Sequence, residues 1–343
     1  MSATSLKIRT PAELIAVLPY MMGYHPSDAV AVVGFTGHRV DFGACHPLPP
    51  PDYGEQELRE ATAAVAQTVS MQGASSVVVI GFGPATRVTP AVMRATRELQ
   101  AVGVRVEDVL RVTGDRWWSY LCPDPACCSP EGMPCLPPDS VIAAEATYRG
   151  HVALPRREDV VAQVEPVAGP DRAEMVAATE RARRRFDELL DPVPADRYAR
   201  TIRSAGRIAV RGAEKRYRSG GTLDADGFAW LGVLLADVMV RDYALDRAGG
   251  QEWSLRLWTE ALRRAEPVHV PSVACVLGFT AWRAGFGALA RAAVERALET
   301  EPEHNLAGLL YNVLAYGLPP HLLPERSLAG SRGPRFGRRR KAR

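Results

Sequence analysis

The sequence predicts an α/β N-terminal half, with a mixed sheet layered with helices, and an all-α C-terminal half. Short continuous apolar runs alternate with helical patterns up to about residue 112, which is typical of α/β layer structures. After Asp171 nearly every segment has helical periodicity. The chain of 343 residues also exceeds the roughly 100–200 residues of one ordinary domain, so two domains are expected.

The predicted N-terminal elements follow in order along the chain. A helical pattern covers 11–22, and Pro11 suits the first turn of this helix. The apolar run at 29–35 predicts a buried strand, and a hairpin turn leads from it to a second strand over 39–46. The elements that follow are helix 55–72, strand 75–82, helix 90–101 and strand 104–112.

Residues 116–140 are rich in proline and cysteine, and they predict one long irregular loop before a helix over 141–149. Long loops inside compact domains are often functional. Residues 151–170 indicate an extended connector. The predicted organisation is an α/β domain over 1–168, a helical domain over 169–326 and a disordered Arg-rich tail over 327–343.

The C-terminal half has predicted helices at about 171–190, 196–218, 224–247, 251–265, 271–284, 286–300 and 304–316. Residues 271–304 resemble one tetratricopeptide-type repeat, which consists of two antiparallel helices. Small residues such as Gly278 and Ala290 fall where the helices of that repeat cross, and Pro302 follows the second helix. A helical bundle that uses small residues for its packing is the alternative.

The positive charge of the chain is concentrated at its end. The formal net charge is +3, but residues 327–343 carry seven basic and no acidic side chains, which leaves about −4 for the rest. Only Lys7, Lys215 and Lys341 are lysines, and this bias towards arginine is typical of a GC-rich genome. The tail at 332–343 could bind nucleic acid in a salt-dependent manner, or it could be a solvated, dispensable segment.

The sequence favours a cytoplasmic location. No apolar stretch of about 18 residues predicts a transmembrane helix, and residues 1–11 lack the apolar core of a secretory signal. Six cysteines in this length are too sparse for a secreted disulfide framework. We therefore expect no membrane association.

The cysteines of the 116–140 loop are the first candidate for chemistry. Cys122, Cys127, Cys128 and Cys135 could supply the four sulfur ligands that structural zinc sites use, although their spacing is not a standard zinc pattern. The adjacent thiols could instead form a labile disulfide with a redox role. In the third interpretation these cysteines are simply buried apolar side chains.

The ends of the predicted strands are the second candidate. Ligands of open α/β sheets bind outside the carboxyl ends of strands. The ligand-binding candidates at strand ends and in the loop before the first strand are Gly81, Gly83, Asp115, Arg116, Trp117, Trp118, His25 and Asp28. Turn formation and core packing are the alternative roles for these residues. The His25–Asp28 loop precedes its strand, so it reaches the same edge only if that strand is antiparallel.

No motif of a serine hydrolase, a zinc protease or a kinase is present, so the sequence does not decide whether the chain is an enzyme.

Arg241 and Asp242 interrupt an apolar stretch of the helix predicted over 224–247. We expect them to form a partly buried ion pair between helices.

Four segments resemble one protein family. They are LPYMMGYHPSDAVAVVGF at 18–35, RWWSYLCPDPACC at 116–128, VRDYAL at 240–245 and AWRAGFGALARAAVERALETEPEHNLAGLL at 281–310. Their order and spacing are similar to the actinobacterial family called domain of unknown function 4192, over about residues 6–320. The resemblance implies an intracellular actinobacterial protein and no stated activity. Ser129-Pro130 follows the paired cysteines, where the family usually has two prolines.

Two functions follow as expectations. The first is a regulatory protein that binds a protein or peptide partner through the helices at 224–316. The alternative is a small-molecule-binding protein or enzyme, with a pocket formed by the strand-end loops near Trp117 and the cysteine loop. Convergence of Asp115, Arg116, Trp117 and Cys127 on one cleft would favour the alternative.

Overall fold

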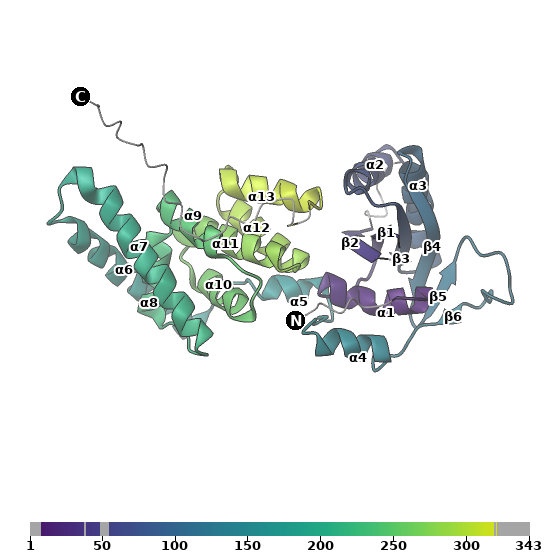
Figure 1. The fold of residues 1–343 in the computed structure, drawn as a ribbon, viewed down its shortest axis with the longest axis horizontal. Helices are drawn as coiled ribbons and strands as arrows, with labels where there is room; N and C mark the ends of the chain where they lie inside the picture. The colour runs from purple at the N-terminus through teal and green to yellow at the C-terminus, as the bar shows by residue number, and fades with distance from the viewer. Residues whose placement is uncertain (1–7, 38, 49–54, 319, 321–343) are drawn as a thin grey trace, which may run out of the picture.

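A computed structural model describes residues 8–37, 39–48, 55–318 and 320 (Figure 1). Its sheet contains β1 (Ala29–Thr36), β2 (Arg39–Pro47), β3 (Ser76–Phe82), β4 (Arg105–Thr113), β5 (Arg116–Ser119) and β6 (Met133–Pro134). The strand order is β2-β1-β3-β4-β5-β6, and only β3 and β4 pair in parallel. The predicted mixed sheet is therefore confirmed.

Helices cover both faces of this sheet, because side chains of successive strand residues point to opposite faces. On one face, Val32, Val77 and Val79 pack against α2 (Glu55–Met71) and α3 (Ala85–Ala101). On the other face, Val33 and Ile80 pack against α1 (Pro11–Met22). α4 (Val141–Tyr148) lies against α1 on its outer side. The continuous apolar strands of the sequence are thus buried on both faces.

The predicted loop over 116–140 is wrong in part, because it contains β5 and β6. Gly114 and Asp115 form a two-residue turn between β4 and β5, in which Gly114 has φ 62°. This turn folds the strand that carries both tryptophans back onto β4, before the first proline of the loop interrupts regular structure.

Three other predicted boundaries differ from the structure. α3 begins at Ala85 and contains Pro90, where the sequence analysis expected the helix to begin. The connector over 151–170 contains a short helix, α5 (Arg157–Ala162). The long helix predicted over 224–247 is two helices, α8 (Ala225–Leu234) and α9 (Val238–Arg247). Asp237 separates them, because its side chain accepts hydrogen bonds from the first amides of α9.

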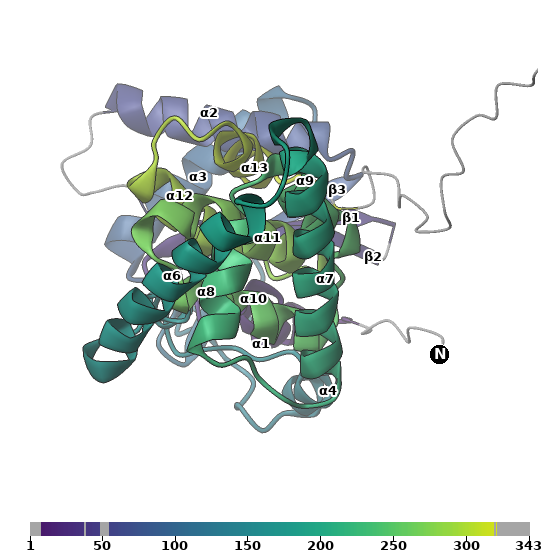
Figure 2. The same cartoon turned by 90° about the vertical axis from the view of Figure 1, so that its left-hand side faces the viewer.

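The helical half lies at the opposite end of the molecule from the sheet (Figure 1), and Figure 2 views the molecule from the helical end. Its other helices are α6 (Gly169–Leu190), α7 (Tyr198–Arg218), α10 (Glu252–Arg264), α11 (Val270–Arg283), α12 (Gly287–Thr300) and α13 (Asn305–Ala315). One apolar core, with Leu234, Trp258 and Leu277 fully buried, joins these helices. The mainly helical C-terminal half predicted from the sequence is confirmed.

α11 and α12 form a closely packed hairpin. A side chain at Gly278 would lie 2.7 Å from Cγ2 of Val294, so only glycine allows these helices to approach as they do. The small residues that suggested a tetratricopeptide-type repeat therefore have a packing role, and the repeat assignment itself stays a prediction.

Among the described residues, no helix combines the length and apolarity that crossing a bilayer requires. The Arg-rich tail predicted at 327–343 lies outside the described residues.

A buried histidine makes the helical half sensitive to acid. His269 is 8% exposed, and neither ring nitrogen has a hydrogen-bond partner among the described residues. Burial, with a smaller contribution from Arg183, lowers the pKa of His269 from 6.5 to about 4. The unfolded chain therefore binds a proton that the folded chain rejects. The free energy of unfolding should fall between pH 6.5 and pH 4, by up to roughly 3 kcal/mol from this group.

Urea unfolding at neutral and at acidic pH measures this loss. In His269→Phe the difference between the two pH values should shrink, whereas the same substitution at the exposed His25 should leave the wild-type difference unchanged. An equal pH dependence in His269→Phe and the wild type would show that His269 does not cause it.

Candidate functional site

The loop before β1 lies at the carboxyl edge of β3 and β4. β1 is antiparallel to β3, and Ala29 pairs with Phe82, so Asp28 lies beside Gly83. Because β1 is antiparallel, the His25–Asp28 loop reaches the same edge of the sheet as the strand-end candidates. The Asp28 carboxylate accepts hydrogen bonds of 3.0 and 2.5 Å from Arg87 at the start of α3. The ion pair compensates the charge of Asp28 and joins the loop to the helix. His25 is exposed, and its backbone amide donates to Leu154.

The glycines at this edge allow close packing. Gly83 has φ 141°, a conformation that favours glycine, and its carbonyl accepts a hydrogen bond of 2.6 Å from the hydroxyl of Thr113. A side chain at Gly81 would lie 2.1 Å from Cγ1 of Val88. α3 therefore covers Gly81, which leaves the backbone of Gly83 nearer to solvent.

The strand β5 places its two tryptophans on opposite faces. Trp117 is buried in the sheet core with Met133 and Cys135. Trp118 stacks against the guanidinium of Arg111 at 3.8 Å, and its indole nitrogen donates to the carbonyl of Pro130. Both rings are thus occupied by packing within the chain. The predicted pocket would need Trp117 to face a cleft, and its burial in the core works against that role.

Arg116 of β5 joins the end of the cysteine loop to the strand that precedes this loop. Its guanidinium donates to the carbonyls of Gly132 at 2.8 Å and Glu131 at 3.4 Å. Asp115 is exposed in the turn, and its carbonyl accepts from the amide of Cys135 at 2.7 Å. These contacts fix both ends of the loop to the β5–β6 pair, so the residues between them are presented from a rigid base.

Three thiols converge within this loop. The sulfur atoms of Cys122, Cys127 and Cys128 all lie within 4.8 Å of one another. Cys127 is exposed, and the other two are half-buried. The turn that brings them together is held by Asp124, whose carbonyl accepts from the amides of Cys127 at 3.1 Å and Cys128 at 2.8 Å. We call these three residues the thiol cluster.

A polar chain anchors the thiol cluster to the sheet. The hydroxyl of Ser119 accepts from the amide of Cys122 at 3.1 Å and donates to the carboxylate of Asp108 on β4 at 2.6 Å. Outer contacts of this kind orient the ligands of metal sites. No sequence pattern predicts Asp108 and Ser119 as part of the site, because only the pairing of β4 with β5 brings them together.

The thiols of the cluster differ in acidity. A hydrogen bond from the side chain of Cys128 lowers the pKa of Cys122, and a hydrogen bond with the backbone of Asp124 lowers it further. The same hydrogen bond to Cys122, together with burial, raises the pKa of Cys128 to about 12. Cys122 is therefore the first of this pair to ionise, and Cys128 shares its proton with the resulting thiolate.

Cys135 stands apart from the thiol cluster. It packs against the sheet core beside Trp117, and burial raises its pKa. Of the four cysteines predicted as one set of ligands, the structure thus brings three together and places the fourth outside the cluster, against the sheet core. The difference arises because Cys135 directly follows β6, whose pairing with β5 fixes its position.

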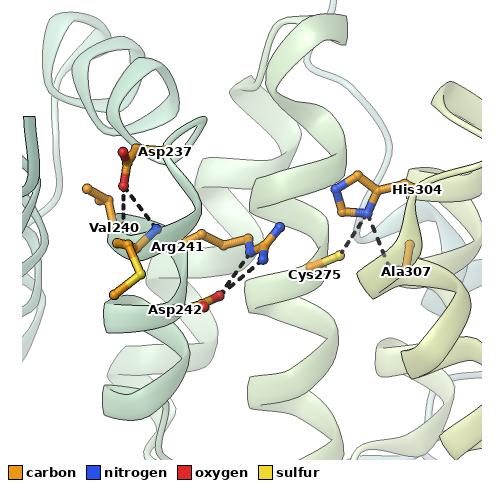
Figure 3. A network of polar contacts seen from close by, with 8 residues as sticks. Asp237, Val240, Arg241, Asp242, Cys275, His304 and Ala307 are labelled. Atoms are coloured by element: carbon orange, nitrogen blue, oxygen red, sulfur yellow. Dashed lines mark hydrogen bonds and ion pairs between the residues drawn. The ribbon is translucent and has the colours of Figure 1, made fainter. Parts of the chain in front are cut away.

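A second constellation, which no local sequence pattern predicts, lies between α9, α11 and α13 (Figure 3). The Cys275 sulfur lies 3.7 Å from Nδ1 of His304, and this nitrogen also accepts from the amide of Ala307 at 3.2 Å. Burial raises the pKa of Cys275 to about 12 and lowers the pKa of His304. Both groups are therefore neutral near pH 7, and His304 caps α13 instead of forming the thiolate–imidazolium pair of a nucleophile with Cys275.

Arg241 extends from α9 towards this constellation and is 14% exposed (Figure 3). Its partner is Asp242 at 3.1 Å, and that side chain is 48% exposed. The expected ion pair between helices is thus wrong in one respect, because the two residues are neighbours in the same helix.

The family suggested by the four sequence segments is the one that matches the chain. The model of the family described as domain of unknown function 4192 matches residues 11–321. The chain belongs to this family. The match covers the sheet, the thiol cluster and the helical half together. No curated protein and no solved structure matches the chain significantly.

Proposed function

We propose that this member of the family binds one soft metal ion, zinc(II) or copper(I), through Cys122, Cys127 and Cys128. The observation that carries the proposal is the mutual approach of the three sulfur atoms to within 4.8 Å. In a tetrahedral site with zinc–sulfur distances of about 2.3 Å, the sulfur atoms lie about 3.8 Å from one another. The three thiols would therefore have to move together by up to about 1 Å to enclose the ion.

The ligand set favours an exchangeable ion over a structural one. Structural zinc sites have four protein ligands, whereas three protein ligands leave a position for water or another molecule. Thiolates select zinc and copper(I) among the common ions of cells. The exposure of Cys127 gives an ion, a chelator or a partner thiol a route to the cluster. Reversible binding, as in metal sensing or metal transfer, fits these properties best.

Cobalt(II) titration, followed by the thiolate–cobalt absorption, tests the proposal and its stoichiometry. We expect one ion per chain, released when competing zinc is added. Cys122→Ser and Cys128→Ser should each weaken binding by roughly a hundredfold or more, because changes even in outer contacts cost about 10–100-fold. Binding should strengthen as the pH rises, because the thiols must lose their protons.

Cys135→Ser is the matched control, since this cysteine lies in the same loop but outside the cluster. It should bind cobalt as the wild type does. Equal loss in Cys135→Ser and Cys122→Ser would contradict the three-residue site. Rapid loss of two free thiols in air, without metal binding at any pH, would favour the redox interpretation instead.

The other predicted functions rest on weaker support. Val238 and Leu309 are exposed apolar side chains in the helices predicted to bind a partner, but they define no particular partner. The interaction role of helices 224–316 therefore stays a prediction. The pocket-based alternative would depend on Trp117, and the packing of this residue in the sheet core gives that alternative less support than the thiol cluster has.

A further inference from the structure

α7 carries an unusual row of positive charge at the end of the molecule away from the sheet (Figure 1). The row consists of Arg200, Arg203, Arg207, Arg211 and Lys215. Its members follow one another at steps of three or four residues, which places them on one face of the helix. All five side chains are exposed. At 1.5 Å per residue the row is about 22 Å long.

The row is not paired with acidic side chains within the described part of the chain, where Asp196 lies beside it without forming an ion pair. None of its five residues forms an ion pair there. Arg211 donates to the carbonyl of Arg207, and Arg207 lies over the ring of Tyr243 at 5.4 Å, but neither contact supplies negative charge. The single acidic residue of α7, Glu214, points inward and is bound by Arg247.

Other arginines of the same half behave differently. On the neighbouring α6, Arg181 pairs with Asp226 at 2.7 Å and Arg183 pairs with Glu180 at 2.8 Å. Like charges at successive turns of a helix repel and destabilise it. Since the chain without its tail has a net charge of about −4, the row on α7 is a local concentration of positive charge and not a general property of the surface.

A cavity lies beside the row of positive charge. Its volume is about 630 Å³, and it is lined by Arg200, Arg203, Arg207 and Arg211 together with Asp196, Ala199, Ser204 and Ile208. Ile208 is the one large apolar side chain in this lining. Protein interfaces have an apolar core with aromatic anchors, which this face lacks. The opposite face of α7, with Val210 and Tyr217, is buried in the core and is not free to enter a bilayer.

We propose that this face of α7 binds the phosphate backbone of nucleic acid without reading its sequence. Guanidinium groups bind phosphate through two parallel hydrogen bonds, and a regular row of them matches the regular charge of a nucleic-acid strand. The site is remote from the thiol cluster and does not depend on the metal proposal. It is also distinct from the Arg-rich tail, whose charge is the same in every variant of the test.

Fluorescence anisotropy with a labelled DNA duplex of arbitrary sequence, at low and at physiological salt, tests the proposal on the full chain. The variant Arg203→Gln/Arg207→Gln should bind roughly tenfold more weakly at low salt. Its plot of log affinity against log salt should be shallower by about 2, since each lost phosphate contact reduces the slope by about 1. Glutamine is a good helix former, so α7 should persist, and circular dichroism checks this.

Arg181→Gln/Arg183→Gln is the matched control, because it removes the same charge from exposed but paired arginines of α6. It should bind the duplex within about twofold of the wild type. Equal loss in both double variants would overturn the proposal, since the effect would then follow net charge alone. Unchanged DNA binding in the α7 variant, with loss of its binding to anionic lipid vesicles, would also overturn it.

Discussion

Glu214→Ala is expected to lower the free energy of unfolding by about 3–5 kcal/mol, the range for breaking a buried ion pair. The Glu214 side chain is 4% exposed and accepts three hydrogen bonds from Arg247, at 2.5, 2.9 and 3.0 Å. This pair joins α7 to α9 across the core. Without Glu214, the guanidinium of Arg247, whose side chain is 21% exposed, loses the carboxylate that accepts its hydrogen bonds at the edge of the core.

Urea unfolding followed by circular dichroism measures this loss. The double variant Glu214→Met/Arg247→Met should recover much of the stability, because buried pairs are often replaced by apolar residues at little cost. Removal of the exposed Arg181–Asp226 pair by Asp226→Ala should cost less than about 1 kcal/mol. A loss for Glu214→Ala no larger than for Asp226→Ala would show that the buried pair does not stabilise the helical half.

Arg296→Ala should have the second-largest effect, a loss of about 3 kcal/mol. The guanidinium of Arg296 donates to the carbonyl of Val164 in the connector and to that of Leu262 at the end of α10, at 3.1 Å in the latter case. Burial lowers the pKa of Arg296 to about 10, with a smaller contribution from Arg172. Hydrogen bonds to charged groups contribute roughly 1.5–3 kcal/mol each. Without Arg296 the carbonyl of Val164 has no other donor among the described residues, whereas that of Leu262 still accepts from the amide of Ala265.

Hydrogen exchange locates this effect as well as measuring it. Exchange should accelerate in α5 and the connector over 160–167, because Arg296 holds this segment against α10 and α12. Arg157→Ala is a suitable control, since Arg157 is 48% exposed and forms a longer pair, 3.4 Å, with Glu295 of α12. Protection of the connector that is equal in Arg296→Ala and the wild type would contradict this role.

Much of the fold could be predicted because local and tertiary preferences agree. Thr10 and Glu13 form a capping box at the start of α1, and the continuous apolar runs of β1 and β3 are buried on both faces. The wrong element boundaries occur where a hydrophobic pattern or a proline-rich composition hides a local signal. The apolar pattern continues from α8 into α9, so the break at Asp237 was not evident. β5 has only four residues and leads directly into a proline-rich loop.

The site was predictable to a smaller extent. The sequence placed four cysteines in one loop, but the turn at Asp124 and the pairing of β6 decide which three converge. Cys275 and His304 are 29 residues apart, and no local pattern joins them. From the sequence alone, genome composition explains the arginines of α7, because their position on one exposed face follows only from the packing of the helix.

Metal content per chain is the most direct test of the central proposal. Elemental analysis should be carried out on untagged protein purified under reducing conditions without chelator, beside the triple variant Cys122→Ser/Cys127→Ser/Cys128→Ser and the control Cys135→Ser. We predict about one zinc or copper ion per chain in the wild type and the control, and none in the triple variant. Equal metal content in the wild type and the triple variant, or none in either after zinc is supplied, would contradict the proposed site.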